Sequence, residues 1–276
     1  MSTTPTSSTP TSTTPPNTTP TSTTPPSPPT SGATMNDLEA FFRRHTGRRL
    51  HKWLHYFEVY DRHFARFRGS APVVLEFGVS QGGSLEMWKE YFGPGARLYG
   101  VDINPACRRF EEEGVRIFIG DQADRAFLRS LAHEVPRPDI LIDDGGHAMA
   151  QQIATFEELY PHVQPNGVYL CEDLHTSYWR RWGGGYRRRG SFIELTKGRI
   201  DALHAWHSRS RRLQVDDFTR STHSIHYYDS IVVIEKRPMA EPTDEARGTT
   251  LFPDYAVPPH DAVERLQRWW KKVRGR

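Results

Sequence analysis

The 276-residue sequence carries 36 Lys and Arg against 33 Asp and Glu, a formal net charge of +3. This mild excess lacks the basic bias typical of nucleic-acid-binding domains, and no apolar run reaches the roughly 18 residues that a membrane span needs. The two cysteines, Cys107 and Cys171, lie far apart and suit a reducing cytoplasm, and we expect no disulfide and no zinc site. Composition therefore favours a cytoplasmic protein that binds neither nucleic acid nor membrane.

The first 34 residues are almost entirely Ser, Thr and Pro, without charged or aromatic side chains. Such a segment cannot bury enough apolar surface to offset its ordering entropy, so 1–34 is predicted to be a disordered, dispensable tail. It lacks the basic start and apolar middle of a secretory signal. It is either a genuine extension or the result of a start placed too early, with Met35 opening the foldable sequence. Residues 35–276 suffice for one α/β domain.

Past the tail, the first recognisable element is 50–67, an amphipathic helical region rich in aromatic and His side chains. Packing is the favoured role for these side chains, and ligand contact is the alternative. β-rich runs then follow at 73–79, 97–103, 115–121, 139–144 and 167–173. The segments between them include "SLEMWKEYF", "PACRRFEEE", "ADRAFLRSLAHEV" and "MAQQIATFEELYPHV", which have helical apolar spacing. This alternation predicts a doubly wound, Rossmann-like α/β fold with a mostly parallel sheet and helices on both faces.

Two further segments complete the predicted domain. The stretch 176–212 begins with aromatic residues and Gly183–Gly185 and then turns helical, so we interpret it as an insertion that forms a lid and the acceptor pocket. Residues 224–237 predict two strands joined by a tight Asp-Ser turn, hence an antiparallel hairpin at the edge of the sheet. The arginines of 180–189 and 209–212 favour a solvated surface or a loop facing an acidic group, with nucleic-acid contact as the weaker alternative.

Acidic side chains follow four successive strands. They are Asp102, Asp121, the pair Asp143 and Asp144, and the pair Glu172 and Asp173. One such residue is ordinary turn chemistry. In doubly wound sheets, however, ligands bind outside the carboxyl ends of the strands, so four occurrences in succession predict a lined cleft. The stretch "LIDDGGH" adds an imidazole, His147, to this edge.

The turn after the first strand, "EFGVSQGGS", is rich in glycine but does not match the dinucleotide pattern G-x-G-x-x-G. Its glycines include Gly78 and Gly82, and the carboxylate of Glu76 precedes them. That carboxylate would repel a pyrophosphate and would suit a cationic ligand such as S-adenosylmethionine (SAM). Asp102 is then expected to bind the ribose hydroxyls and Asp121 the adenine amino group, with Gln122 beside it. A nicotinamide-dependent oxidoreductase is the alternative.

Seven motifs within 53–236 carry a resemblance to a known family. They are "HYFEVYDRHF", "LEFGVSQGGSLEMWKEYF", "YGVDI", "GDQ", "LIDDGGH", "CEDLHTSYW" and "HYYDSIVVIEK". Together they resemble the metal-dependent sugar O-methyltransferases of the macrocin and mycinamicin group, within the class I SAM-dependent methyltransferases. The group usually has Ser where Gly146 stands, which leaves the charged residues unchanged. Some members carry an extra amino-terminal domain not recognised in this sequence, so a homo-oligomer is left open.

The resemblance implies a role for each acidic residue at the fourth and fifth strand ends. Asp144, Glu172 and Asp173 match the residues that bind Mg²⁺ in the family, and His147 matches the general base. The residue types agree with this, because three carboxylates form a hard oxygen site of the kind that Mg²⁺ prefers. His175 is interpreted as a supporting or substrate contact. For Asp143 we expect a structural or cofactor-side hydrogen bond.

The implied function is SAM-dependent, Mg²⁺-assisted O-methylation of a hydroxyl, in a sugar vicinal diol of a glycosylated small molecule such as a macrolide. A tailoring hydroxylase on the same fold is an alternative, but its iron site would favour two His and one carboxylate, and here carboxylates outnumber the candidate His ligands. A binding module without catalysis would have little use for both a metal set and a base.

Overall fold

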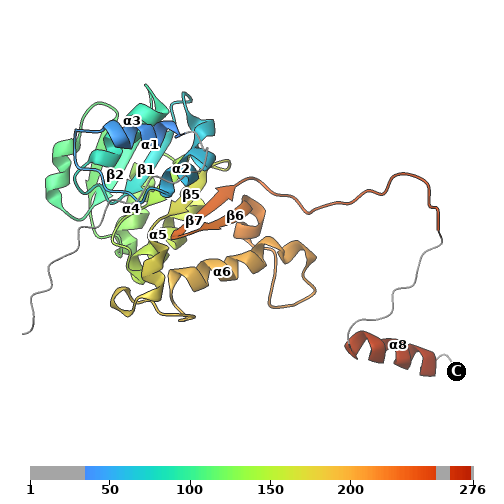
Figure 1. Ribbon diagram of the computed structural model, residues 1–276. Coiled ribbons are helices and arrows are strands. Elements are labelled where there is room, and N and C mark those ends of the chain that lie inside the picture. Colours follow the sequence, from blue (N-terminus) through green and yellow to red (C-terminus); the bar gives the residue numbers. More distant parts are fainter. Residues whose placement is uncertain (1–34, 253–261, 275–276) are drawn as a thin grey trace, which may run out of the picture.

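The computed structural model describes residues 35–252 and 262–274, so the predicted tail 1–34 lies outside the described residues (Figure 1). A seven-stranded sheet forms the centre of the domain, in the order β3-β2-β1-β4-β5-β7-β6. Its strands are β1 (Val73–Phe77), β2 (Arg97–Asp102), β3 (Val115–Ile119), β4 (Ile140–Asp143), β5 (Val168–Cys171), β6 (Thr222–Tyr228) and β7 (Ile231–Lys236). β1 to β5 are parallel, whereas β7 runs antiparallel to both β5 and β6. The predicted doubly wound sheet with an antiparallel edge hairpin is confirmed.

Helices connect the strands and cover both faces of the sheet (Figure 1). The α-helices are α1 (Asp37–Arg44), α2 (Tyr56–Phe64), α3 (Gly83–Phe92), α4 (Arg125–Glu134), α5 (Met149–Leu159), α6 (Phe192–Leu203), α7 (Asp217–Ser221) and α8 (Ala262–Arg274). Short 3₁₀ turns are η1 (Ala65–Phe67), η2 (Pro105–Phe110), η3 (Tyr160–His162), η4 (Leu174–Tyr178), η5 (Arg180–Trp182) and η6 (Ala205–His207). None of the described helices combines the length and the apolar character needed to cross a membrane.

Two predicted helical segments are shorter than expected. The segment that begins at Pro105 forms only the 3₁₀ turn η2, in which Cys107 is the one buried side chain. An isolated segment with so little apolar surface cannot stabilise a full α-helix. Helix α2 begins at Tyr56, because the preceding stretch forms no regular helix and ends in a turn at 54–55; Lys52, within that stretch, is buried.

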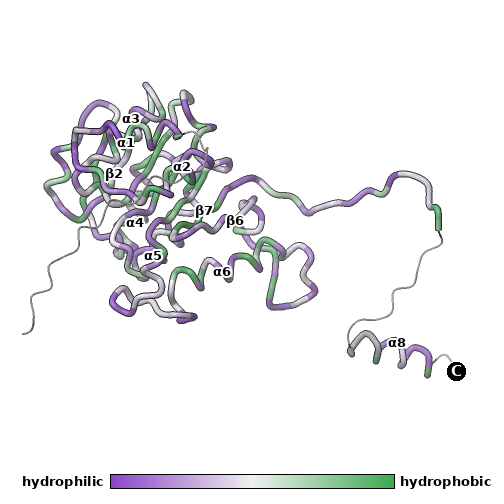
Figure 2. Tube along the Cα trace, in the orientation of Figure 1, coloured by the Kyte–Doolittle hydropathy of each residue, from purple (hydrophilic) through white to green (hydrophobic). Residues whose placement is uncertain are grey.

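The core consists of two apolar layers, one on each face of the sheet. Successive side chains of β1 alternate between them, since Val74 faces the first layer and Leu75 the second. The first layer packs against α1, α2 and α3, and the second against α4, α5 and α6. In Figure 2, green hydrophobic segments gather around β7 in the interior. The carboxyl ends of the parallel strands are thereby fixed between the two layers and can carry polar side chains.

Candidate active site

A cavity of about 550 Å³ opens at the carboxyl ends of the parallel strands β1 to β5. One part of its wall, the glycine-rich half, consists of 77–81, Gly83 and Ser84 together with Asp102, Asp121 and Gln122. The opposite part, the acidic half, is lined by Lys52, Trp53, Tyr56, Asp144, His147, Glu172 and Asp173. The volume is in the range typical of sites for small-molecule ligands and cofactors.

The glycine-rich half depends on a close approach between two loops. Gly78 has φ of +93° and donates its backbone N–H to the Val101 carbonyl at 2.8 Å. A Cβ at this position would collide with the backbone carbonyl of Asp144. Glycine therefore allows the loop after β1 to lie against the loop after β4, which brings the two halves of the cavity together.

The predicted cofactor residues at the ends of β2 and β3 line the cavity. The Asp102 carboxylate accepts from the backbone N–H groups of Ser80 and Asn104, both at 2.8 Å. Asp121 accepts from the N–H of Ala123 at 2.8 Å. Each carboxylate is thus held by its own loop, and each retains acceptor capacity for hydroxyl or amino groups in the cavity.

Gln122 joins this loop to the loop after β4. Its amide nitrogen donates to Asp143 at 2.6 Å and to Thr155 at 2.9 Å, while its oxygen accepts from the N–H of Gly146 at 2.9 Å. Asp143 itself is fully buried beneath the cavity and does not line it. This burial raises the pKa of the Asp143 carboxyl to about 6, against the opposing Gln122 hydrogen bond. Asp143 is therefore placed as a structural acceptor.

Two other residues predicted to contact the cofactor also lie outside the cavity lining. Glu76 is buried on β1, where its carboxylate accepts from Ser84 Oγ at 2.7 Å and Trp88 Nε1 at 2.9 Å. Burial raises the pKa of Glu76 to about 6, although Lys52 acts in the opposite direction. Gly82 precedes α3 with φ of +77° and shapes the turn. Neither residue presents a side-chain group to the cavity wall.

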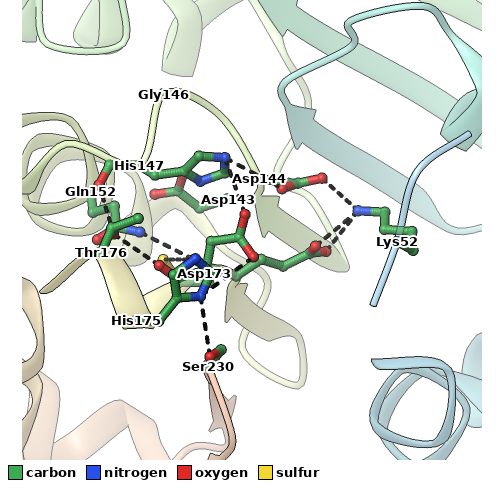
Figure 3. A network of polar contacts seen from close by, with 12 residues as sticks. Lys52, Asp143, Asp144, Gly146, His147, Gln152, Asp173, His175, Thr176 and Ser230 are labelled. Carbon is green, nitrogen blue, oxygen red and sulfur yellow. Dashed lines mark hydrogen bonds and ion pairs between the residues drawn. The ribbon is translucent and has the colours of Figure 1, made fainter. Parts of the chain in front are cut away.

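In the acidic half, Asp144, His147 and Asp173 converge, as Figure 3 shows. His147 Nε2 lies 3.4 Å from Asp173 Oδ2 and 4.0 Å from Asp144 Oδ1. One ligand atom from each of the three lies within 4.8 Å of the others. His147 and Asp173 both have left-handed backbones, with φ of +56° and +55°. Such conformations are costly for residues with a Cβ, and they tend to occur at functional sites.

Lys52 enters the acidic half from the blue N-terminal ribbon (Figure 3). Its Nζ donates to Asp144 Oδ2 at 2.5 Å and to Glu172 Oε2 at 2.9 Å. Burial by itself would lower the pKa of Lys52, but the Asp144 and Glu172 carboxylates raise it by more, so the side chain is an ammonium. This ammonium neutralises part of a site in which three carboxylates crowd together.

Two tyrosines of α2 hold one oxygen each of Glu172 and Asp173. Tyr60 donates to Glu172 Oε1 at 2.6 Å, and Tyr56 donates to Asp173 Oδ1 at 2.8 Å. Glu172 is consequently occupied by Lys52 and Tyr60 and does not join the cluster of Asp144, His147 and Asp173.

The donor set fits a divalent cation. Two carboxylates and an imidazole face one another, and hard oxygen ligands are those that Mg²⁺ prefers. His147 Nδ1 is buried and has no hydrogen-bond partner among the described residues. Burial and the Asp144 charge raise the pKa of Glu172, with Lys52 opposing them, so the site has a deficit of positive charge. A bound cation would relieve that deficit.

No protein-family model matches the chain. It is 39% identical over 198 residues to the 8-demethyl-8-alpha-L-rhamnosyl tetracenomycin-C 2'-O-methyltransferase of Streptomyces olivaceus, covering 67% of this chain and 52% of that protein. It is 36% identical over 196 residues to mycinamicin VI 2''-O-methyltransferase of Micromonospora griseorubida, covering 67% and 49%. The structure of the MycE methyltransferase in complex with Mg, SAH and mycinamycin VI superposes with a TM-score of 0.66 at 33% identity, covering 85% of this chain and 59% of that chain.

The chain resembles the sugar O-methyltransferases of the macrocin and mycinamicin group, and its fold is that of the class I methyltransferases. The predicted resemblance is thereby confirmed. The chain spans about half the length of the curated relatives it matches.

Sequence reasoning missed Lys52, Tyr56 and Tyr60 as members of the site, because packing was favoured for 50–67. One signal was available: Tyr56 and Tyr60 are four residues apart, which places both hydroxyls on one face of a helix. Nothing near Lys52 in the sequence indicates its partners, which are 92 and 120 residues away.

Aromatic side chains lie around the acidic half of the cavity. The His175 ring lies 4.8 Å from that of Trp179 and 6.1 Å from that of Trp53. Trp53 and Trp179 are each about half exposed, and Trp182 packs edge-on against His147. His175 is fixed by Ser230 Oγ, 3.2 Å from its Nδ1. Exposed aromatic faces beside polar groups are suited to stacking against a sugar or a macrocycle.

Proposed function

We propose that the chain is a SAM-dependent, Mg²⁺-assisted O-methyltransferase that acts on a sugar hydroxyl of a glycosylated secondary metabolite such as a macrolide. The observation that carries this proposal is the joining, in one cavity, of a glycine-rich half and an acidic half that fits a cation. The relatives support it, since their names specify methyl transfer to sugar hydroxyls, and the MycE structure contains Mg, SAH and a glycosylated macrolide.

In this proposal SAM binds in the glycine-rich half. Asp102 accepts hydrogen bonds from the ribose hydroxyls, and Asp121 accepts from the adenine amino group, with Gln122 bracing both loops. Gly78 allows the methionine portion to approach the backbone closely. The sulfonium methyl group would be the group transferred, and the acceptor would bind in the acidic half.

Asp144 and Asp173 would hold Mg²⁺, with Glu172 as the third carboxylate next to Lys52. When bound, the ion supplies a positive charge that orients a pair of hydroxyls and makes one of them more acidic. His147 accepts the proton of that hydroxyl at a ring nitrogen while the oxygen displaces the methyl group from sulfur. The products are the methyl ether, S-adenosylhomocysteine (SAH) and a protonated His147, which returns its proton to solvent.

Lys52, Tyr56 and Tyr60 position the carboxylates and do not exchange protons with the substrate in this scheme. Their donors hold one oxygen each of Asp144 and Asp173, which leaves the other oxygen of each available, whereas both oxygens of Glu172 are already held. Preorganised ligands lose less entropy when they bind an ion. This explains why a segment 92 or more residues upstream of the carboxylates contributes to the site.

The acceptor is proposed to bind at the aromatic rim of Trp53 and Trp179, with 176–212 acting as the lid. Within that range, the described structure has η4 and η5 beside the cavity and then α6. The partner would accordingly be a glycosylated small molecule. A cytoplasmic location is proposed from the cysteine content, because both Cys107 and Cys171 are buried thiols.

Thermal-shift measurements with SAM, SAH and NAD(H), each with and without Mg²⁺, test the cofactor assignment. We expect stabilisation by SAM and SAH and none by NAD(H); stabilisation by NAD(H) alone would overturn the proposal. A mass-spectrometric assay with glycosylated macrolides then tests the reaction. Gain of one methyl group, abolished by a chelator and restored by Mg²⁺, is the expected result, whereas gain of an oxygen atom would indicate the hydroxylase alternative.

A further inference from the structure

A second cluster of metal-ligating side chains lies at the antiparallel edge of the sheet. His63 comes from α2, His226 from β6 and Glu235 from β7. One ligand atom from each lies within 4.8 Å of the others, and His63 Nδ1 is 2.7 Å from Glu235 Oε1. None of the three lines the catalytic cavity.

We propose that this cluster is a structural site for a transition-metal dication of the Zn²⁺ type. Two imidazoles and one carboxylate are ligands that suit Zn²⁺ and related ions, whereas Mg²⁺ prefers sites of oxygen ligands. The site is independent of the catalytic metal and involves neither cysteine. Water would complete the coordination from the open side, where Glu235 borders a surface pocket with Arg66 and Asn166.

The simpler explanation is a hydrogen-bonded pair between His63 and Glu235, supported by Arg66 at 3.7 Å from Glu235 Oε2. That pair does not include the second imidazole, His226, whose Nε2 lies 2.9 Å from Ser224 Oγ. The ring centroids of His226 and His63 lie 4.8 Å apart. The second ring nitrogen of His63, Nε2, lies 3.0 Å from the Tyr228 hydroxyl oxygen. Two adjacent imidazoles repel each other when both are protonated, but they can both bind the same metal ion.

The protonation state of His63 is compatible with metal binding. His63 is almost fully buried, and this burial lowers the pKa of its imidazole despite the opposing hydrogen bond with Glu235. A metal-binding imidazole must have a free lone pair, so a neutral ring is the form required. The ion would replace the hydrogen bond between His63 and Glu235 with two coordinate bonds.

A metal at this position would link α2 to the edge hairpin. Helix α2 also carries Tyr56 and Tyr60, which contact Asp173 and Glu172 in the acidic half. The turn of the hairpin supplies Ser230, which contacts His175. The proposed ion would therefore stabilise the two elements that support the catalytic carboxylates from outside.

The test is a zinc titration followed by thermal unfolding, on protein without a histidine tag and in excess Mg²⁺. At a hundredfold excess of Zn²⁺ over its dissociation constant, we expect the melting temperature to rise by roughly 5 to 10 °C. His226→Asn should lose this rise while keeping the hydrogen bond between His63 and Glu235. Glu235→Gln retains an oxygen for His63 but removes the anionic ligand, so its rise should shrink strongly.

His133→Asn is the matched control, because His133 is exposed on α4 and does not belong to the cluster. It should respond to zinc as the wild type does. Zinc bound at the catalytic cavity would affect wild type and His226→Asn equally, so the difference between them reports the edge site. An equal rise in wild type, His226→Asn and Glu235→Gln would overturn the proposal, as would a zinc anomalous signal found only beside Asp144 and Asp173.

Discussion

The two halves of the cavity are built in different ways. In the glycine-rich half, Asp102 and Asp121 are held by backbone N–H groups no more than 22 residues away. In the acidic half, Asp144, Glu172 and Asp173 are held by side chains that lie 92 to 120 residues upstream. Local turns thus shape the proposed cofactor site, whereas the packing of α2 on the sheet shapes the proposed metal site. Substitutions in the two halves should accordingly have separable effects. We expect those in the glycine-rich half to weaken SAM binding and those in the acidic half to impair Mg²⁺ binding or turnover.

The largest effect is expected from Asp144→Asn. Loss of this charge removes a proposed metal ligand and a partner of Lys52, so turnover should fall at least about 10³-fold, because a catalytic metal contributes several kcal/mol. Calorimetric titrations should show weakened Mg²⁺ binding and nearly unchanged SAM binding. If SAM affinity fell as far as Mg²⁺ affinity, the two halves would not be separable.

His147→Ala should lower turnover on the order of 10²- to 10⁴-fold, the contribution of a general base. Mg²⁺ and SAM binding should remain close to wild type, which distinguishes a proton acceptor from a metal ligand. The wild-type pH–rate profile should also show an acid limb that the variant lacks. Near-normal turnover with an unchanged acid limb would favour His175 as the base, and a large loss of Mg²⁺ affinity would make His147 a ligand.

Asp102→Ala should weaken SAM binding by about 1 to 3 kcal/mol, the cost of losing hydrogen bonds to a charged group. Mg²⁺ affinity should not change, which makes this variant the counterpart of Asp144→Asn. Asp102 also accepts hydrogen bonds from the backbone N–H groups of Ser80 and Asn104, so its removal would disturb the loop as well. Asp102→Asn is therefore the milder variant, because its amide oxygen remains as an acceptor. SAM affinity equal to wild type in both variants would contradict the assignment of Asp102 to the ribose.

The smallest effect on ligand binding is expected from Glu76→Gln, because Glu76 lies outside the cavity lining. SAM affinity should change by less than about fivefold, under 1 kcal/mol. A loss as large as that of Asp102→Ala would instead support the cofactor role predicted for Glu76 from the sequence. SAM titration measures the affinity, and urea unfolding of the same preparation shows whether the substitution has changed the free energy of unfolding.

The same variant tests the pKa of Glu76, which is raised from 4.5 to about 6 in the folded protein. A raised carboxyl pKa means that folding favours the protonated form, so this group makes the protein less stable as the pH rises from 4.5 through 6. The cost at pH 7 is about 2 kcal/mol. Wild type should therefore lose stability relative to Glu76→Gln across this range, and parallel pH profiles would show that the pKa is not raised.

Much of the architecture was predictable, because apolar residues recur along the chain at the spacings typical of strands and helices. The five parallel strands, the edge hairpin and the acidic residues at the strand ends all follow from local patterns. The helical segment from Pro105 was not predictable in detail, since a few apolar residues resemble a helix until their lack of packing partners is known.

By itself, the sequence determined which strand ends carry carboxylates and which turn carries the glycines. Only the tertiary structure decided which carboxylates face the cavity. Asp143 and Asp144 are neighbours, yet one is buried against Gln122 and Tyr169 and the other meets Lys52. Successive side chains point to opposite sides of a strand, and the side that becomes the cavity is fixed by the layers that pack around it. Lys52 and the α2 tyrosines join the site for the same reason: long-range packing creates contacts that no local pattern encodes.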